Sequence, residues 1–383
     1  MQDNVRVTVV GAGVVGCATA LQIQQKLPNA TVSIVAAHTS PDTTSNVAAG
    51  MVIPPFIPDT TLSSQKQWFR DTFSHFLRLI KDHHAGIYLT NGYQLYNATY
   101  NEIPFWTADV FGLRAVTNEE LAMFPGCSHG FHFTTLKCEV TTYLAYLMHR
   151  LTALGVNIIE KHLCDLFELE GQADVIVLCA GMGSAHLISD PDLCPIRGQV
   201  VKVYAPSLHT FVRVGDGITY IYPGAGGMVT LGGIKAAGDG DLRVRDSETR
   251  DILARCFTVM PFLKNAIGDS KNDEFALKDE RKNFLCNSGC VKTTWGRDHE
   301  TGWRVGVGLR PFRKQVRLDR LWLRGSQGQR MRLVTCYGHG GGGISLHWGS
   351  ATEAADRVLD WIQDPEGKGV QDAWPANRIP AKL

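Results

Sequence analysis

A glycine-rich turn near the N-terminus constrains the fold more than any other feature of this sequence. A short β-rich run, residues 5–10, leads directly into Gly11-Ala12-Gly13-Val14-Val15-Gly16. Residues 17–27 then have the alanine and leucine content of a helix, and residues 31–35 form a second β-rich run. A strand, a glycine turn, a helix and a strand within about thirty residues predict a unit that binds a dinucleotide.

The three glycines have different expected roles in such a unit. Gly11 permits the tight turn, Gly13 lets the backbone approach a pyrophosphate, and Gly16 lets helix and strand pack closely. The phosphates would lie at the helix N-terminus, where free N–H groups and the helix dipole favour anions. The acid that usually holds the ribose is missing, because residues 35–38 read Val-Ala-Ala-His. Its absence argues against NAD and favours FAD, leaving His38 either on the ribose or in solvent.

Composition and charge exclude several classes of protein. The chain has 383 residues, 44% of them hydrophobic, enough for one large core or two that share an interface. The net charge of +1 supports neither a nucleic-acid groove nor an electrostatic membrane anchor, and no apolar run is long enough to span a bilayer. Ten scattered cysteines without a secretion signal predict reduced thiols inside the cell. We expect no metal site, because Cys286, Cys290 and His299 lack a fourth ligand and a close pair spacing.

The periodicity of apolar residues predicts an α/β fold with two interleaved domains. Helical spacing marks residues 62–80, 141–154 and 351–362, whereas residues 174–181 read as a buried strand and residues 199–231 alternate like a sheet. We expect a Rossmann-like FAD-binding domain and a smaller α+β substrate domain built on a mostly antiparallel sheet. The expected boundaries are about 1–55, 140–190 and 305–365 for the first, about 56–139 and 191–304 for the second with an insertion at 268–303, and 366–383 for a C-terminal tail.

The last three residues form a possible cellular address. Ala381-Lys382-Leu383 fits the small–basic–leucine pattern of a C-terminal peroxisomal signal. The sequence therefore predicts the peroxisomal matrix as location and the import receptor as a partner. It leaves a homo-oligomer open.

Motifs along most of the chain resemble those of the D-amino-acid oxidase family. They are residues 43–51 (TTSNVAAGM), 133–139 (FTTLKCE), 195–200 (PIRGQV), 219–224 (TYIYPG), 308–311 (GLRP) and 337–349 (YGHGGGGISLHWG). The likeness leaves out only the segment 268–303. It implies a two-domain flavoprotein with non-covalently bound FAD. Such an enzyme passes hydride from the Cα of a D-amino acid to flavin N5, and oxygen reoxidises the flavin to give hydrogen peroxide.

The resemblance also implies which residues contact the cofactor. Together with the glycine turn, they are Gly11, Gly13, Gly16, Ala37, His38, Thr44, Ser45, Met51, Leu163, Ala180, Gly340, Gly341, Gly343, Ile344 and Ser345. The glycine run 340–343 suits this role physically, because it exposes backbone N–H groups to a flat ring whose reduced form is negatively charged. We interpret His339 and His347 as structural, hydrogen-bonding histidines.

For the substrate, the resemblance implies a carboxylate clamp made of Tyr220 and Arg310, with Gly341 beside it. A planar guanidinium grips both carboxylate oxygens, and a phenol adds one directional hydrogen bond. Without the motifs, Tyr220 would read as a strand aromatic and Arg310 as a surface ion pair.

A second cation would bind the side-chain carboxylate of an acidic substrate. Arg213 matches the branch of the family that oxidises D-aspartate. Lys235 stands where that branch usually has arginine, and Pro55 where it usually has histidine. An oxidase of neutral D-amino acids remains the alternative, followed by an NAD-linked dehydrogenase and a flavin-free binding protein of the same fold.

Overall fold

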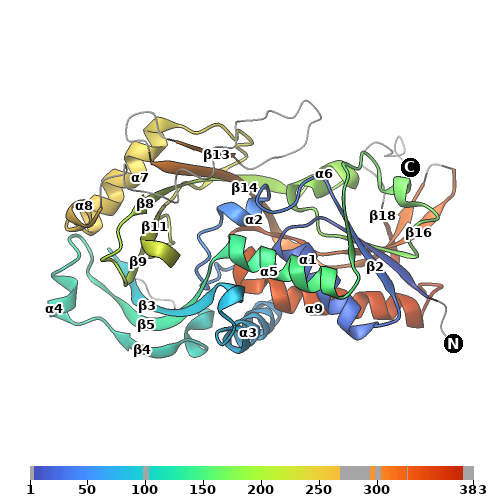
Figure 1. The fold of residues 1–383 in the computed structure, drawn as a ribbon, viewed down its shortest axis with the longest axis horizontal. Helices are drawn as coiled ribbons and strands as arrows, with labels where there is room; N and C mark the ends of the chain where they lie inside the picture. Colours follow the sequence, from blue (N-terminus) through green and yellow to red (C-terminus); the bar gives the residue numbers. More distant parts are fainter. Residues whose placement is uncertain (1–3, 98–102, 268–293, 298–302, 326, 374–383) are drawn as a thin grey trace.

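The protein is built on two β-sheets, which a computed structural model describes for residues 4–97, 103–267, 294–297, 303–325 and 327–373 (Figure 1). In these residues one sheet has seven strands and the other eleven. Part of the predicted insertion, residues 268–293 and 298–302, lies outside the described residues, as does the C-terminal tripeptide.

The seven-stranded sheet carries the predicted dinucleotide unit. Its order is β18-β15-β16-β7-β1-β2-β6, and all neighbours pair in parallel except β15 and β16. The strands are β1 (Arg6–Val10), β2 (Thr31–Ala36), β6 (Asn157–Glu160), β7 (Val175–Leu178), β15 (Arg320–Arg324), β16 (Arg330–Thr335) and β18 (Gln371–Ala373). Helix α1 (Val14–Lys26) joins β1 to β2. The strand–turn–helix–strand prediction is confirmed.

The eleven-stranded sheet is mostly antiparallel and forms the other part of the molecule (Figure 1). Its main path is β13-β14-β8-β11-β10-β9-β3-β5-β4, with β12 on β8 and β17 on β14; only β3 and β9 pair in parallel. The strands are β3 (Ile87–Tyr96), β4 (Phe111–Ala115), β5 (His129–Cys138), β8 (Cys194–Tyr204), β9 (Phe211–Val214), β10 (Thr219–Pro223), β11 (Met228–Gly232), β12 (Ala236–Ala237), β13 (Thr294–Arg297), β14 (Arg304–Arg317) and β17 (Tyr337–His339).

Three long helices pack together beside the seven-stranded sheet. They are α1, α3 (Leu62–Leu79) and α9 (Gly343–Gln363), with α5 (Val140–Ala153) against α1. The predictions for residues 62–80 and 141–154 are confirmed within one residue at each end. The prediction for 351–362 placed the helix start too late, at 351 instead of Gly343. Residues 344–351 are all buried, so they lack the one-sided apolar pattern that marks a helix in sequence.

The remaining helices are short or lie on the larger sheet. They are α2 (Thr44–Val47), α4 (Asn118–Leu121), α6 (Ser184–Leu187), α7 (Asp246–Val259), α8 (Leu263–Ala266) and the 3₁₀ turns η1 (His83–Ala85), η2 (Phe105–Ala108), η3 (Leu166–Leu169), η4 (Gly181–Gly183), η5 (Ala225–Gly227) and η8 (Gly340–Gly342). Among the described residues no helix is both long and apolar enough to cross a membrane. The eight described cysteines are all free thiols.

Candidate active site

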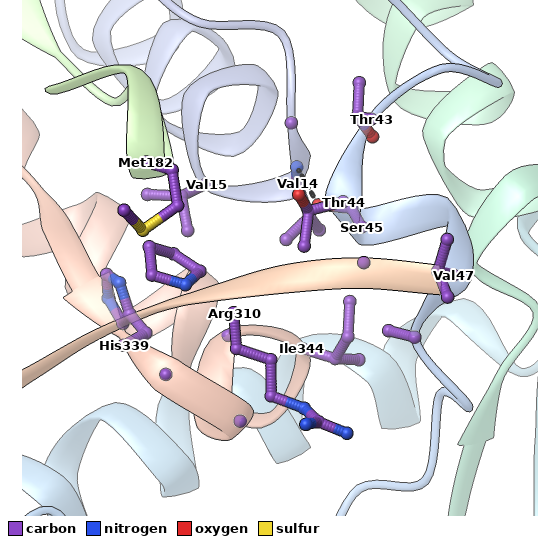
Figure 2. Close-up of a pocket in the computed structure, with 18 of the residues that line it drawn as sticks. Val14, Val15, Thr43, Thr44, Ser45, Val47, Met182, Arg310, His339 and Ile344 are labelled. Carbon is purple, nitrogen blue, oxygen red and sulfur yellow. Dashed lines mark hydrogen bonds between the residues drawn. The ribbon is translucent and has the colours of Figure 1, made fainter. Parts of the chain in front are cut away.

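A cavity of about 470 Å³ runs between the two sheets. One part is lined by the turn after β1, the end of β2 and residues 42–51; the other by β8, β9, β10 and β14. The glycine run 340–343 and Ile344 lie between these parts. Figure 2 shows Thr44, Ser45 and Val14 on one side of β14, with the Arg310 side chain leaving that strand beside Ile344.

The turn after β1 needs glycine for steric reasons that the structure makes explicit. Gly11 has a φ of 115°, and a Cβ there would lie 2.5 Å from the carbonyl oxygen of Cys179. At Gly16 a Cβ would lie 1.9 Å from the carbonyl oxygen of Gly11, so helix and turn touch only because no side chain intervenes. The N-terminus of α1 is tied to the neighbouring segment, because the Val14 N–H donates to Ser45 Oγ at 3.1 Å (Figure 2).

Most residues that the sequence assigns to the cofactor line this cavity. They are Gly11, Gly13, Ala37, His38, Thr44, Ser45, Met51, Leu163, Ala180, Gly340, Gly341, Gly343 and Ile344. Gly16 and Ser345 are not part of the lining. Gly16 lies at the packing contact described above, and the Ser345 hydroxyl is buried and directed at the Met51 carbonyl oxygen, 3.5 Å away.

The residues of the cavity fit FAD. The N-terminus of α1, with Gly13, Val14 and Val15, lines one part of the cavity, and a helix N-terminus is where a pyrophosphate binds. The apolar side chains of Val47, Ile344 and Val200 give walls for a flat ring, and η8 offers backbone without side chains between them. A cavity of this volume is within the range of cofactor sites.

Arg310 is a half-buried cation of the cavity. Its Nη1 donates to the carbonyl oxygen of Ile234 at 2.9 Å, and no ion pair joins it to a carboxylate of the described residues. Burial lowers the pKa of Arg310, which records the cost of placing a charge there. A Cβ at Gly198 on β8 would lie 2.6 Å from the guanidinium carbon, so this glycine makes room for the arginine. A cation that is largely removed from water and has no counter-charge among the described residues indicates an anion-binding site.

Tyr220 lies next to this cation. Its side chain is 7% exposed, and burial raises the pKa of the phenol to about 12, an effect that Arg310 partly opposes. The hydroxyl therefore stays protonated at physiological pH and can donate a hydrogen bond. Tyr222, two residues along the same face of β10, stacks on it with ring centroids 4.3 Å apart. The structure thus places Tyr220 and Arg310 side by side at the cavity.

The two expected cations for a side-chain carboxylate differ in their surroundings. Arg213 is half-buried, lines the cavity and donates to the side-chain oxygen of Gln94 and to the Asp216 carbonyl oxygen at 2.9 Å. Lys235 also lines the cavity, but its side chain is 51% exposed and its Nζ lies 3.6 Å from a carboxylate oxygen of Asp216. Lys235 is thus a rim residue with a counter-charge of its own, not a second unpaired cation.

The two histidines of the C-terminal motif have hydrogen-bond partners. His339 Nε2 lies 2.9 Å from Ser350 Oγ, and His339 faces the cavity. His347 Nδ1 lies 2.9 Å from the Ile344 carbonyl oxygen, and its Nε2 lies 3.0 Å from the Tyr143 hydroxyl. Burial lowers the pKa of His347 to about 3, so it is neutral at physiological pH. These contacts agree with the structural interpretation.

Sequence reasoning missed two residues that line the cavity, Tyr222 and Phe56, and one that contacts a lining residue, Gln94. Tyr222 had a signal, because it is two positions from Tyr220 in a predicted strand and so shares its face. Phe56, 60% exposed, and Gln94, fully buried, had none. Pro55 lines the cavity beside Gly341, where a Cβ would lie 3.8 Å from the proline ring.

Comparisons with known proteins agree with this geometry. A family model described as FAD dependent oxidoreductase matches residues 6–357. The chain is similar to D-aspartate oxidase from Homo sapiens, with 41% identity over 94% of this chain and 96% of the relative. It is similar to D-amino-acid oxidase from Rubrobacter xylanophilus, with 33% identity over 91% of this chain and 94% of the relative.

Solved structures extend the likeness in fold. Glycine oxidase from Bacillus cereus superposes with a TM-score of 0.68 at 17% identity, covering 93% of this chain and 95% of that one. At that identity the superposition supports the fold alone. With the family model spanning most of the chain and two relatives matched almost end to end, this protein belongs to the FAD-dependent oxidoreductases of the D-amino-acid oxidase family.

Proposed function

We propose that the protein catalyses the oxidative deamination of acidic D-amino acids. D-aspartate is the expected substrate, with D-glutamate or N-methyl-D-aspartate also accepted. The products from D-aspartate are the 2-oxo acid, ammonia and hydrogen peroxide. The observation that carries this proposal is a pair of arginines on one cavity, Arg310 and Arg213, neither with a carboxylate partner among the described residues. A dicarboxylate substrate neutralises both.

The protein's part in the reaction is binding and orientation. Arg310 and Tyr220 hold the α-carboxylate, and Arg213 holds the side-chain carboxylate, which together fix the direction of the Cα–H bond. Bound FAD supplies the redox chemistry by accepting the hydride and passing electrons to oxygen. No side chain of the cavity is needed as a general base, and the neutral His347 does not line the cavity.

Neutral D-amino acids are the second candidate. Pro55 is apolar where the acid-oxidising branch usually has histidine, and Lys235 already has Asp216 as its counter-charge. Both features weaken the selection for a second carboxylate.

A substrate panel distinguishes these candidates. The purified protein should be yellow and should release peroxide faster from D-aspartate than from D-alanine or D-proline at equal concentration. Arg213→Ala should remove most of the preference for D-aspartate and keep its flavin, because Arg213 lies away from the dinucleotide turn. Normal D-aspartate turnover by Arg213→Ala would contradict the assignment of that residue.

We also propose that the two sheets correspond to the two domains and that the C-terminal tripeptide directs the enzyme to the peroxisome. The boundary expected at 305 falls inside β14, which pairs in the larger sheet, so the domains share that strand. A fluorescent protein fused to the N-terminus should show peroxisomal puncta, and deletion of Ala381-Lys382-Leu383 should leave diffuse fluorescence. Puncta that survive the deletion would contradict the address.

A further inference from the structure

A buried glutamine, Gln94, lies directly beside Arg213. It is 0% exposed, and the parallel ladder of β3 and β9 pairs it with Arg213. Arg213 in turn pairs with Tyr220 across β9 and β10. Because paired residues share a face of the sheet and neighbouring strands are about 5 Å apart, the register places Gln94, Arg213 and Tyr220 in one row across the sheet. Arg213 and Tyr220 line the cavity, and Gln94 lies behind Arg213 in this row.

The hydrogen bonds of Gln94 fix the orientation of its amide. Its nitrogen donates to the carbonyl oxygen of Gly215 at 3.0 Å and to that of Leu95 at 3.4 Å. Its oxygen accepts from Nη1 of Arg213. A flipped amide would set oxygen against two carbonyl oxygens and nitrogen against a cation, so the oxygen must face the arginine.

Among the described residues, Arg213 donates its hydrogen bonds to neutral oxygens. Besides Gln94, it donates to the carbonyl oxygens of Gly215 at 3.4 Å and Asp216 at 2.9 Å. A Cβ at Gly217 would lie 2.4 Å from its Nε, so the turn after β9 leaves room for the guanidinium. Neutral acceptors fix the position of a cation without cancelling its charge, which leaves that charge available to a ligand.

We propose that Gln94 is a positioning residue that sets the preference for a second carboxylate, by holding Arg213 through a neutral oxygen. This inference rests on the proposed function. A purely structural glutamine, which only satisfies the carbonyl of Gly215, would affect acidic and neutral substrates equally. A positioning residue affects only ligands that carry the second carboxylate.

The test is Gln94→Glu, which keeps the shape of the side chain and places a carboxylate against Arg213. We expect kcat/KM for D-aspartate to fall about 100-fold, mainly through KM, because the arginine then has a buried counter-charge. For D-methionine, which lacks the second carboxylate, kcat/KM should stay within about threefold. Asn91→Glu is the matched control, since Asn91 is exposed on the same strand and the change adds the same charge outside the cavity.

Ligand binding gives a readout that does not depend on turnover. Succinate is the carbon skeleton of aspartate without the amine, and butyrate is its counterpart with one carboxylate. Titrated into the flavin-loaded enzyme and followed by flavin absorbance, succinate should bind about 100-fold more weakly to Gln94→Glu than to wild type, and butyrate equally to both. Gln94→Met, which removes both hydrogen-bonding groups, serves if the glutamate variant does not fold; its succinate affinity should fall about tenfold with butyrate affinity unchanged.

The outcomes separate this inference from the proposed function. A wild-type enzyme that treats D-aspartate no better than D-methionine would overturn the proposed function. If the wild type prefers D-aspartate, and Gln94→Glu and Gln94→Met keep that preference within threefold, only the role of Gln94 is overturned. An equal loss on both substrates in these variants would assign Gln94 a structural role and overturn the inference as well.

Discussion

At the scale of single residues, the site depends on the guanidinium of Arg310, which forms no ion pair with any carboxylate in the part of the chain that the structure describes. Arg310 can grip both oxygens of a carboxylate, whereas lysine keeps the charge and loses the planar fork. We therefore expect Arg310→Lys to lower kcat/KM for every D-amino-acid substrate by roughly 100-fold, with FAD content unchanged. Steady-state peroxide assays and the flavin-to-protein absorbance ratio measure both quantities.

A second variant on the same strand serves as the control for this prediction. Lys314 is exposed on β14, so Lys314→Ala removes a cation from the strand without touching the cavity and should leave kcat/KM unchanged. An Arg310→Lys enzyme as active as wild type would mean that the α-carboxylate is bound elsewhere.

The residues of the site differ in how far the sequence predicts them. Tyr220 and Arg310 were identified because each belongs to a short motif, and both face the cavity. Gln94 was missed because its importance arises from the pairing of β3 with β9, strands more than a hundred residues apart in sequence. The ion pair of Lys235 with Asp216 was unpredictable for a similar reason, since it depends on the course of the turn after β9.

At the scale of elements, a buried hydrogen-bonded chain connects α3, α5 and α9. His75 Nε2 and His347 Nε2 each lie 3.0 Å from the hydroxyl of Tyr143. The Ile344 carbonyl can only accept, so His347 carries its proton on Nδ1 and accepts from Tyr143 at Nε2. His75 then donates to the phenol oxygen, and its ring also stacks on Trp348 with centroids 3.3 Å apart. The chain thereby fixes the first turn of α9, next to the glycine run.

The hydrogen-bonded chain of His75, Tyr143 and His347 makes the free energy of unfolding depend on pH. Burial lowers the pKa of His75 to about 2 and that of His347 to about 3, whereas both are near 6.5 in an unfolded chain. Below about pH 6.5 the two histidines bind protons in the unfolded state but not in the folded state. Their contribution to the free energy of unfolding is therefore fully present above this pH and is lost as the pH falls toward 3. Each histidine should lower the free energy of unfolding by about 2 kcal/mol when the pH falls from 7 to 5.

A single substitution isolates one of these two groups. His75→Gln keeps a hydrogen-bond donor and removes the titration, so the loss of unfolding free energy between pH 7 and pH 5 should shrink by about 2 kcal/mol. Urea unfolding at pH 7 and pH 5 measures this difference in unfolding free energy. His83→Gln is the control, because His83 is exposed. An unchanged pH dependence in His75→Gln would show that His75 takes up protons equally in the folded and unfolded states, so that folding does not lower its pKa.

Helices with one apolar face were predictable, and the buried start of α9 was not. The phenylalanines of α3 recur at helical spacing because one side of that helix faces the core and the other faces solvent. The first turns of α9 are buried on every side, and the helix begins at the last of four consecutive glycines, which disfavour helix when considered alone. This part of α9 is stabilised by packing against α3 and by the hydrogen bonds of His347, although its local helix propensity is low.

At the scale of the whole molecule, the cavity is shared by both sheets. The dinucleotide turn belongs to β1 and α1, whereas Arg310 and Tyr220 belong to the eleven-stranded sheet. A cofactor that spans the cavity therefore contacts both parts and links their unfolding. The path of the polypeptide also links the unfolding of the two sheets, because β15 and β16 return to the smaller sheet after β14 has joined the larger one.

FAD should accordingly stabilise the two sheets as one unit. At a free concentration of about 100 times its Kd, FAD should raise the free energy of unfolding by about 2.7 kcal/mol over the apoprotein and shift one cooperative thermal transition upward by a few degrees. In Gly13→Val the added side chain lies at the cavity wall, so the apoprotein should melt near the wild-type temperature and FAD should produce no shift. Calorimetry with and without FAD makes the comparison. Two separate transitions, only one of them moved by FAD, would mean that the cofactor binds one sheet alone and that the clamp around Arg310 forms without it.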